Sequence, residues 1–190
     1  MPRIPYVYPA AGESQVGDRI RARRGDRGLL PIDGMLSNAP EVARGYNELV
    51  GAIRGKTQVE DILRELLALR VLALNNCLYE WKIHEPLGRA AGLTHAQISA
   101  ISNTSTIGNA AVSRGDIFPP LLATALDFCD ASSIHVKVPQ SVFDRLKEHL
   151  SAKEMVEVTA IIGVFHLISR FCVALDVAEV GEENVPTIEV

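Results

Sequence analysis

The chain has 190 residues, a hydrophobic fraction of 47% and a formal net charge of −4. This length allows one domain with a sizeable core, and the slightly acidic balance gives no indication of a nucleic-acid partner. The basic run at 19–27 (RIRARRGDR) is diluted by Asp18 and Asp26. We therefore interpret this run as a solvated segment.

The three cysteines, Cys77, Cys129 and Cys172, include no pair with the spacing of metal ligands. The opening MPRIPYVYP contains prolines where a secretory leader has an apolar run. We therefore expect a cytoplasmic protein whose cysteines hold no metal. We also expect no membrane partner, because the longest apolar stretch, at 155–175, contains charged residues that a membrane would tolerate poorly.

In chain order, the proline- and glycine-rich residues 1–36 show little periodicity and are expected to form an N-terminal arm. Residues 37–180 should form a helical domain, followed by a tail at 181–190. Only IHVKV (134–138) alternates like a strand, so we predict an all-α fold. A polar connector is expected at 102–120. The predicted helices cover 38–54, 57–74, 77–91, 94–103, 119–130, 139–150 and 151–177.

Four of these predicted helices begin with the pattern of a capping box. In this pattern, the side-chain oxygen of the N-cap residue accepts a hydrogen bond from a backbone N–H of the first turn. An acid or amide three residues later accepts one from the backbone N–H of the N-cap residue. The pairs are Asn38 with Glu41, Thr57 with Glu60, Thr94 with Gln97, and Ser151 with Glu154.

Three charged or polar residues lie in nearly all-apolar helical sequence: Glu65, His166 and Arg170. An isolated buried carboxylate is costly, so Glu65 should find a partner or stay protonated. His166 and Arg170 are four residues apart and should also meet polar groups. Arg170 is a candidate partner for a substrate carboxylate, although a structural ion pair is the simpler interpretation.

Cys77, Glu80 and His84 fall on one face of a predicted helix, at positions i, i+3 and i+7. If Asn76 caps this helix, Cys77 lies in the first turn, where a thiolate is favoured. Glu80 and His84 are one turn apart and suit proton transfer near neutral pH. The alternative is a solvated Glu–His pair beside a buried, unreactive cysteine.

The remaining aromatic and histidine side chains near this stretch are weaker candidates. Tyr79 and Trp81 flank Glu80 and are more typical of a core or an interface than of a ligand platform. The other histidines stand in polar or capping sequence and are expected at the surface: His95, His135 and His149.

The segment LRELLALRVLALNNCLYEWKIHEPLGRAAGL (63–93) resembles the central segment of the carboxymuconolactone decarboxylase family, within the alkylhydroperoxidase D-like superfamily. Residues 30–54 are similar to the preceding helix of that family, and residues 138–177 to its C-terminal half. The resemblance implies an all-α fold that works without metal or organic cofactor. It also implies a homo-oligomer (trimer, hexamer or dimer) with active sites near subunit interfaces.

In the peroxidase branch of the superfamily, the motif is a Glu, then Cys-x-x-Cys, then a His four residues beyond the second Cys. By position these fall on Glu65, Cys77, Glu80 and His84, so a glutamate replaces the second cysteine. Dithiol chemistry needs a resolving thiol, and neither of the other cysteines matches that role. The resemblance therefore points to the proton-transfer branch.

The function expected from these residues is that of a decarboxylase, another lyase or an isomerase acting on a small carboxylated lactone or related carbonyl compound. His84 would be the general acid/base, Glu80 would orient it, and Glu65 would relay a proton. Two alternatives stay open at this stage. One is a single-cysteine peroxidase using Cys77, and the other is a noncatalytic oligomeric binding protein with the same fold.

Overall fold

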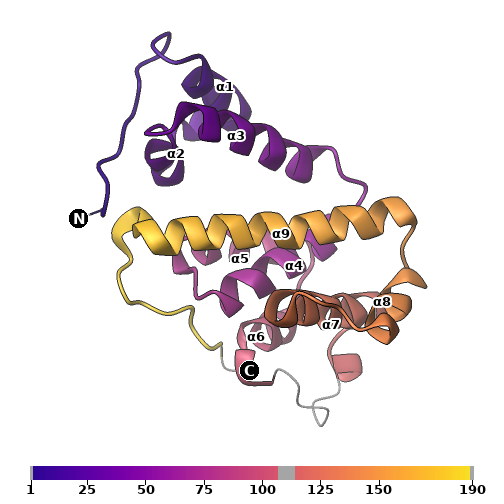
Figure 1. Ribbon diagram of the computed structural model, residues 1–190. Coiled ribbons are helices and arrows are strands. Elements are labelled where there is room, and N and C mark those ends of the chain that lie inside the picture. The colour runs from indigo at the N-terminus through magenta and orange to yellow at the C-terminus, as the bar shows by residue number, and fades with distance from the viewer. Residues whose placement is uncertain (1, 107–113, 189–190) are drawn as a thin grey trace. The chain divides into compact units, whose positions relative to one another are not determined.

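The computed structural model describes residues 2–106 and 114–188, and these form helices and loops without a strand (Figure 1). The all-α prediction is confirmed for this part of the chain. Two compact units are present. Unit 1 comprises Met1–Thr57 and Phe171–Glu182, and unit 2 comprises Gln58–Arg170 and Glu183–Val190.

Unit 1 contains helices within the segment expected to be a loose arm. Its elements are α1 (Gln15–Arg24), η1 (Gly25–Arg27), α2 (Pro31–Leu36), α3 (Pro40–Gly55) and η4 (Val177–Glu179). The α1 sequence has no clear apolar stripe, so periodicity did not predict it. Tertiary contacts stabilise this part instead: the Arg24 guanidinium donates to the buried Asp33 carboxylate at 2.9 Å, and Tyr8 packs against Gly34.

Unit 2 is built around one apolar helix. Its elements are α4 (Asp61–Leu74), α5 (Leu78–Ala90), α6 (His95–Ser102), η2 (Thr104–Thr106), η3 (Arg114–Asp116), α7 (Pro120–His135), α8 (Gln140–Lys147) and most of α9 (Ala152–Leu175). Helix α4 packs against α5, α6 and α7, and α7 packs against α8. Because α4 has neighbours on several sides, almost all of its apolar side chains are fully buried.

Two of the four predicted capping boxes form. Thr94 and Gln97 cap α6, and Ser151 and Glu154 exchange hydrogen bonds at the start of α9. The Thr57 cap was wrong, because α4 begins only at Asp61 and the Thr57 hydroxyl donates to the Ile53 carbonyl. The Asn38 cap was also wrong.

Helix α3 begins at Pro40, where the fixed φ of proline suits the first helical position. The Asn38 amide donates instead to the carbonyl oxygens of Pro5 and Met35.

Residues 134–138, which alternate like a strand in the sequence, form no strand. Ile134 and His135 end α7, and Val136 adopts a positive φ of 62° that terminates the helix. The predicted connector at 102–120 contains the last residue of α6, η2, η3 and the first residue of α7, and its residues 107–113 lie outside the described part.

Helix α9 is the one described helix that is long and apolar enough to cross a membrane by length and composition. The core helix of a soluble protein passes the same test, so this is weak evidence. Its side chains alternate between buried and exposed positions along the helix. The buried positions include Ile161, Ile162 and Phe165.

Candidate active site

A glycine allows α4 and α5 to approach closely beside the predicted site. A Cβ atom on Gly88 would lie 2.9 Å from Cδ1 of Leu69 and 3.8 Å from Cβ of Glu65. Gly88 is one turn beyond His84 on α5, and Leu69 is one turn beyond Glu65 on α4. The missing side chain therefore lets the two helices meet where Glu65 and His84 face each other.

His84 has a carboxylate next to each of its ring nitrogens. Its Nδ1 donates to Oε2 of Glu65 at 2.6 Å, and its Nε2 lies 3.5 Å from Oε2 of Glu80. All three residues are buried: His84 is 2% exposed, Glu65 is 4% exposed and Glu80 is 6% exposed. The structure thus brings together the three residues predicted as catalytic, although their catalytic role remains a prediction.

Positive groups lie beside the two carboxylates of this cluster. Nε of Arg64 lies 3.7 Å from Oε1 of Glu65, although the same guanidinium pairs more closely with Asp61, at 2.8 Å. Burial by itself lowers the pKa of His84, but hydrogen bonds to Glu65 and Glu80, together with their charges, outweigh it. The pKa of His84 is therefore raised above its ordinary value of 6.5.

The ring of Phe165 on α9 forms an apolar wall against the histidine. The ring centroids of His84 and Phe165 are 4.9 Å apart, and the planes are perpendicular. This edge contact fixes the imidazole orientation and lowers the local dielectric constant. Sequence reasoning missed Phe165, because no local pattern indicates which residue of α9 crosses α5.

Cys77 lies at the N-cap of α5 rather than in its first turn, and it is 1% exposed. The expected capping role of Asn76 was wrong: Asn76 has a positive φ of 51° and binds the C-terminal segment, with its Oδ1 accepting from the backbone N–H of Val185 at 2.7 Å. The sulfur is as deeply buried as the His84 ring. This position fits the small, buried cysteine considered as an alternative.

His166 and Arg170 form a separate polar cluster with the end of α4. Nδ1 of His166 accepts from Nδ2 of Asn75 at 2.8 Å and from Nη1 of Arg170 at 2.5 Å. Because two donors share this nitrogen, the neutral ring carries its proton on Nε2. Burial, followed by the Arg170 charge, lowers the pKa of His166. Arg170 therefore contacts a histidine, with no carboxylate partner among the described residues.

The two aromatic candidates differ in burial. Trp81 is buried in the core of unit 2 and Tyr79 is partly buried. The three histidines expected at the surface are exposed: His95, His135 and His149. In the part of the chain that the structure describes, no group of three His, Cys, Asp or Glu side chains is arranged to hold a metal ion.

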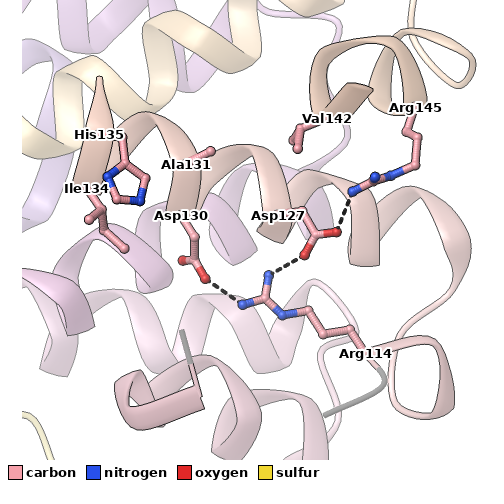
Figure 2. A pocket seen from close by; sticks show the side chains of 8 residues that line it. All are labelled: Arg114, Asp127, Asp130, Ala131, Ile134, His135, Val142 and Arg145. Atoms are coloured by element: carbon pink, nitrogen blue, oxygen red, sulfur yellow. Dashed lines mark hydrogen bonds and ion pairs between the residues drawn. The ribbon is translucent and has the colours of Figure 1, made fainter. Parts of the chain in front are cut away.

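A hollow of ≈ 240 Å³ opens elsewhere on unit 2, and none of the predicted site residues lines it (Figure 2). Its lining comes from η3, α7 and α8 and combines ion pairs with apolar side chains. Sequence reasoning missed this region, although Asp127 and Asp130 are conspicuous charges in the otherwise apolar α7 sequence.

Solved structures share this fold at low sequence identity. An alkylhydroperoxidase AhpD core protein of Ralstonia eutropha, an uncharacterized peroxidase-related protein, matches with a TM-score of 0.73 and 18% identity, covering 93% of this chain and 90% of that one. The apo debrominase Bmp8 matches with a TM-score of 0.71 and 18% identity, covering 92% and 90%.

A putative antioxidant defence protein AhpD of Agrobacterium tumefaciens matches with a TM-score of 0.63 and 19% identity, covering 80% of this chain and 96% of that one. These similarities define the class of the fold as alkylhydroperoxidase D-like.

Residues 40–112 match the sequence model of the carboxymuconolactone decarboxylase family. Over those residues the resemblance seen in the sequence is confirmed. The matched segment includes Glu65, Glu80 and His84. No curated protein sequence matches the chain significantly.

Proposed function

We propose that the chain is a cofactor-independent enzyme that transfers protons on a small carboxylated lactone or related carbonyl compound, as a decarboxylase, another lyase or an isomerase. The observation that carries this proposal is the buried imidazole of His84 with a carboxylate beside each nitrogen. In such an arrangement the protonated histidine is the acid, and a neighbouring carboxylate can return the proton after it has been given up.

For decarboxylation, the bond between the substrate and its carboxylate breaks, and carbon dioxide leaves. The electron pair stays on the substrate as an enolate or dienolate, which needs a nearby hydrogen-bond donor and then a proton on carbon. Nε2–H of His84 is that proton donor, because its 3.5 Å separation from Glu80 leaves it less tightly held than Nδ1–H. Glu80 then returns a proton from solvent to Nε2.

The two carboxylates thus take the reverse of the roles expected from the sequence, in which Glu80 orients the ring and Glu65 relays a proton. The 2.6 Å hydrogen bond from Nδ1 to Glu65 fixes the ring and stabilises its positive charge before proton transfer. Lactone opening, dehydration and isomerisation use the same proton movements beside a carbonyl. The proposal therefore defines a reaction class, with decarboxylation as its leading member.

The sequence of this cluster argues against dithiol chemistry, because Glu80 occupies the place of a resolving cysteine. The debrominase Bmp8, crystallised as a cysteine-to-alanine variant with 2,3,4-tribromopyrrole, binds a small ring. That ligand is close in size to a lactone, which supports a small cyclic substrate for this fold.

The self-assembly expected from the family is also part of this proposal. On α9 the apolar residues Val156 and Leu167 are 70% and 50% exposed, with the exposed Gly163 between them. Their spacing of seven and four residues places them on one side of the helix. We propose that a second copy of the chain covers this face.

The test uses a carboxylated unsaturated lactone, with release of carbon dioxide and the lactone product followed together. His84→Gln should lower kcat at least about a hundredfold, since general acid catalysis contributes about 10²- to 10⁴-fold. The matched control is His149→Gln, which changes an exposed histidine. Unchanged turnover in His84→Gln, with the fold intact by circular dichroism, would overturn the proposal.

A solvent-exchange measurement extends the test to the other reactions of the class. In D₂O, the wild-type chain should introduce deuterium at the carbon next to the carbonyl of a saturated lactone, as detected by NMR. Glu80→Gln should slow this exchange, because it removes the group that reloads Nε2. Equal exchange rates in Glu80→Gln and the wild-type chain would exclude Glu80 from the mechanism.

A further inference from the structure

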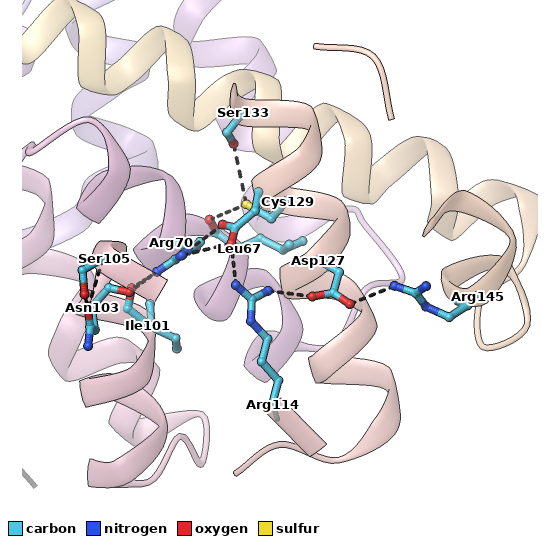
Figure 3. Close-up of polar contacts among 11 residues, drawn as sticks. Leu67, Arg70, Ile101, Asn103, Ser105, Arg114, Asp127, Cys129, Ser133 and Arg145 are labelled. Atoms are coloured by element: carbon cyan, nitrogen blue, oxygen red, sulfur yellow. Dashed lines mark hydrogen bonds and ion pairs between the residues drawn. The ribbon is translucent and has the colours of Figure 1, made fainter. Parts of the chain in front are cut away.

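A chain of ion pairs joins α4, η3, α7 and α8 on the side of unit 2 that carries the hollow (Figure 3). It starts at Arg70, one of the most completely buried large side chains. Arg70 binds both oxygens of Asp130, at 2.6 and 3.0 Å, and donates to the carbonyl oxygens of Ile101 and Asn103. All the nitrogens of Arg70 are therefore engaged inside the protein.

The chain continues outward through two further guanidinium groups. Arg114 bridges the two carboxylates, with Nη2 2.5 Å from Oδ2 of Asp130 and Nη1 2.9 Å from Oδ1 of Asp127. Nη2 of Arg145 on α8 lies 2.9 Å from Oδ2 of Asp127. Figure 2 shows Arg114 and Arg145 on either side of Asp127, at the edge of the hollow.

The charges in this chain do not cancel. Three guanidinium groups face two carboxylates, which leaves one positive charge in excess. Each carboxylate accepts from two arginines, so the two carboxylate charges are shared among three guanidinium groups. Arg145 binds no other described residue than Asp127, and its side chain is 48% exposed, so the excess charge is accessible at this end.

The rest of the hollow is lined by three apolar side chains and one histidine. Ala131, Ile134 and His135 come from α7 and Val142 from α8, and Ile134 is an exposed large hydrophobic residue. A concave surface with apolar walls and a few convergent polar groups is typical of a small-molecule site. The volume of ≈ 240 Å³ restricts the occupant to a small molecule.

We propose that this hollow binds a small monocarboxylate with an apolar body, at a site separate from the Glu65–His84–Glu80 cluster. The carboxylate pairs with the free edge of Arg145 and with the outer N–H groups of Arg114, where two parallel hydrogen bonds are geometrically favoured. The apolar body lies against Ile134 and Val142. One negative charge on the ligand matches the single excess positive charge of the ion-pair chain.

The first experiment titrates the whole wild-type chain with benzoate, benzamide and benzylamine and follows backbone amide shifts by NMR. Benzoate should bind and shift signals from α7 and α8, benzamide should bind about tenfold more weakly, and benzylamine should not bind there. Equal affinity for benzoate and benzamide would overturn the proposal. Benzoate shifts confined to α4 and α5 would also overturn it, because they place the ligand at the candidate active site.

Two variants separate a binding site from a structural ion-pair chain. Arg145→Gln should weaken benzoate binding about tenfold. The matched control Arg89→Gln, which changes a 41% exposed arginine paired with Glu85 on α5, should leave it unchanged. Val142→Glu should abolish binding by placing a negative charge on the wall. A loss of stability in Arg145→Gln with unchanged benzoate affinity would show that the chain of ion pairs is structural only.

Discussion

Nδ1 of His84 on α5 lies 2.6 Å from Oε2 of Glu65 on α4, and both groups are nearly inaccessible to solvent. So short a contact between a buried carboxylate and a protonated imidazole is a charge-assisted hydrogen bond. The pair therefore links two helices, and the carboxylate compensates the charge of the protonated ring. The stability of the fold and the protonation of His84 are thus coupled.

The raised pKa of His84 predicts a specific pH dependence of stability. The protonated form is favoured in the folded chain, so its stabilisation is complete below the unfolded pKa near 6.5 and is lost as pH rises through the higher folded pKa. The difference in unfolding free energy between wild type and His84→Gln should therefore shrink as pH rises above about 6.5. Urea denaturation between pH 6 and 9 measures it.

His135→Gln is the control for this series, because His135 is exposed and distant in sequence from the cluster. It should retain the pH dependence of the wild-type chain. A constant difference between wild type and His84→Gln across the range would contradict a raised pKa for His84.

The two carboxylates beside His84 should contribute unequally to stability. Glu65→Ala removes the 2.6 Å partner and leaves His84 buried without its main hydrogen bond, which should destabilise the fold by roughly 3–5 kcal/mol. Glu80→Ala removes a contact of 3.5 Å and should cost less. Urea denaturation midpoints at constant pH compare the two variants, with Glu148→Ala, which changes an exposed glutamate, as the control. A larger loss in Glu80→Ala would contradict this ranking.

Much of this cluster follows from the sequence. A glutamate in an almost entirely apolar helix must find a partner, and the i, i+4 spacing of Glu80 and His84 already placed those two side chains on one face. The contact with Phe165 could not be predicted, because it depends on where α9 crosses α5. The sequence of α9 does not indicate which of its residues contacts α5, because many of them are equally apolar.

The same distinction explains the outcome for the fold. The capping box of Thr94 and Gln97 is a local device, and it formed as predicted. Helix α1 has a charged sequence with a weak apolar face, and long-range partners such as Asp33, which binds Arg24, stabilise the region. Helix propensity and hydrophobic periodicity depend only on residues that are close in the sequence. Elements that are stabilised by residues far away in the sequence were therefore missed.

Arg70 should be among the residues whose loss is most damaging to unit 2. Arg70→Met keeps the length and apolar stem of the side chain but deprives Asp130 of two hydrogen bonds and two backbone carbonyl groups of their donor. Breaking a buried ion pair from one side should destabilise the fold by about 3–5 kcal/mol. Thermal and urea denaturation test this, and a loss comparable to that of Arg44→Met, an exposed arginine, would contradict it.

Cys129 should be chemically inert in the native chain. Burial, followed by the charge of Asp130, raises the pKa of its thiol from 9.0 to about 12. At pH 8 only about one molecule in 10⁴ carries a thiolate, which is the reactive form. Iodoacetamide at pH 8 should therefore leave Cys129 unmodified, as read by peptide mass spectrometry. In guanidinium chloride all three cysteines should react, and rapid native labelling of Cys129 would contradict its burial.

The exposed apolar face of α9 predicts a change of oligomeric state on substitution. Leu167→Glu places a charge on the face proposed to contact a second copy, where it would be buried without a partner, so the assembly should dissociate. Light scattering coupled to size-exclusion chromatography gives the mass directly. Val136→Glu changes another exposed apolar residue, 85% exposed beyond the end of α7, and should leave the mass unchanged. A wild-type mass equal to one chain, or equal masses for wild type and Leu167→Glu, would contradict self-assembly through α9.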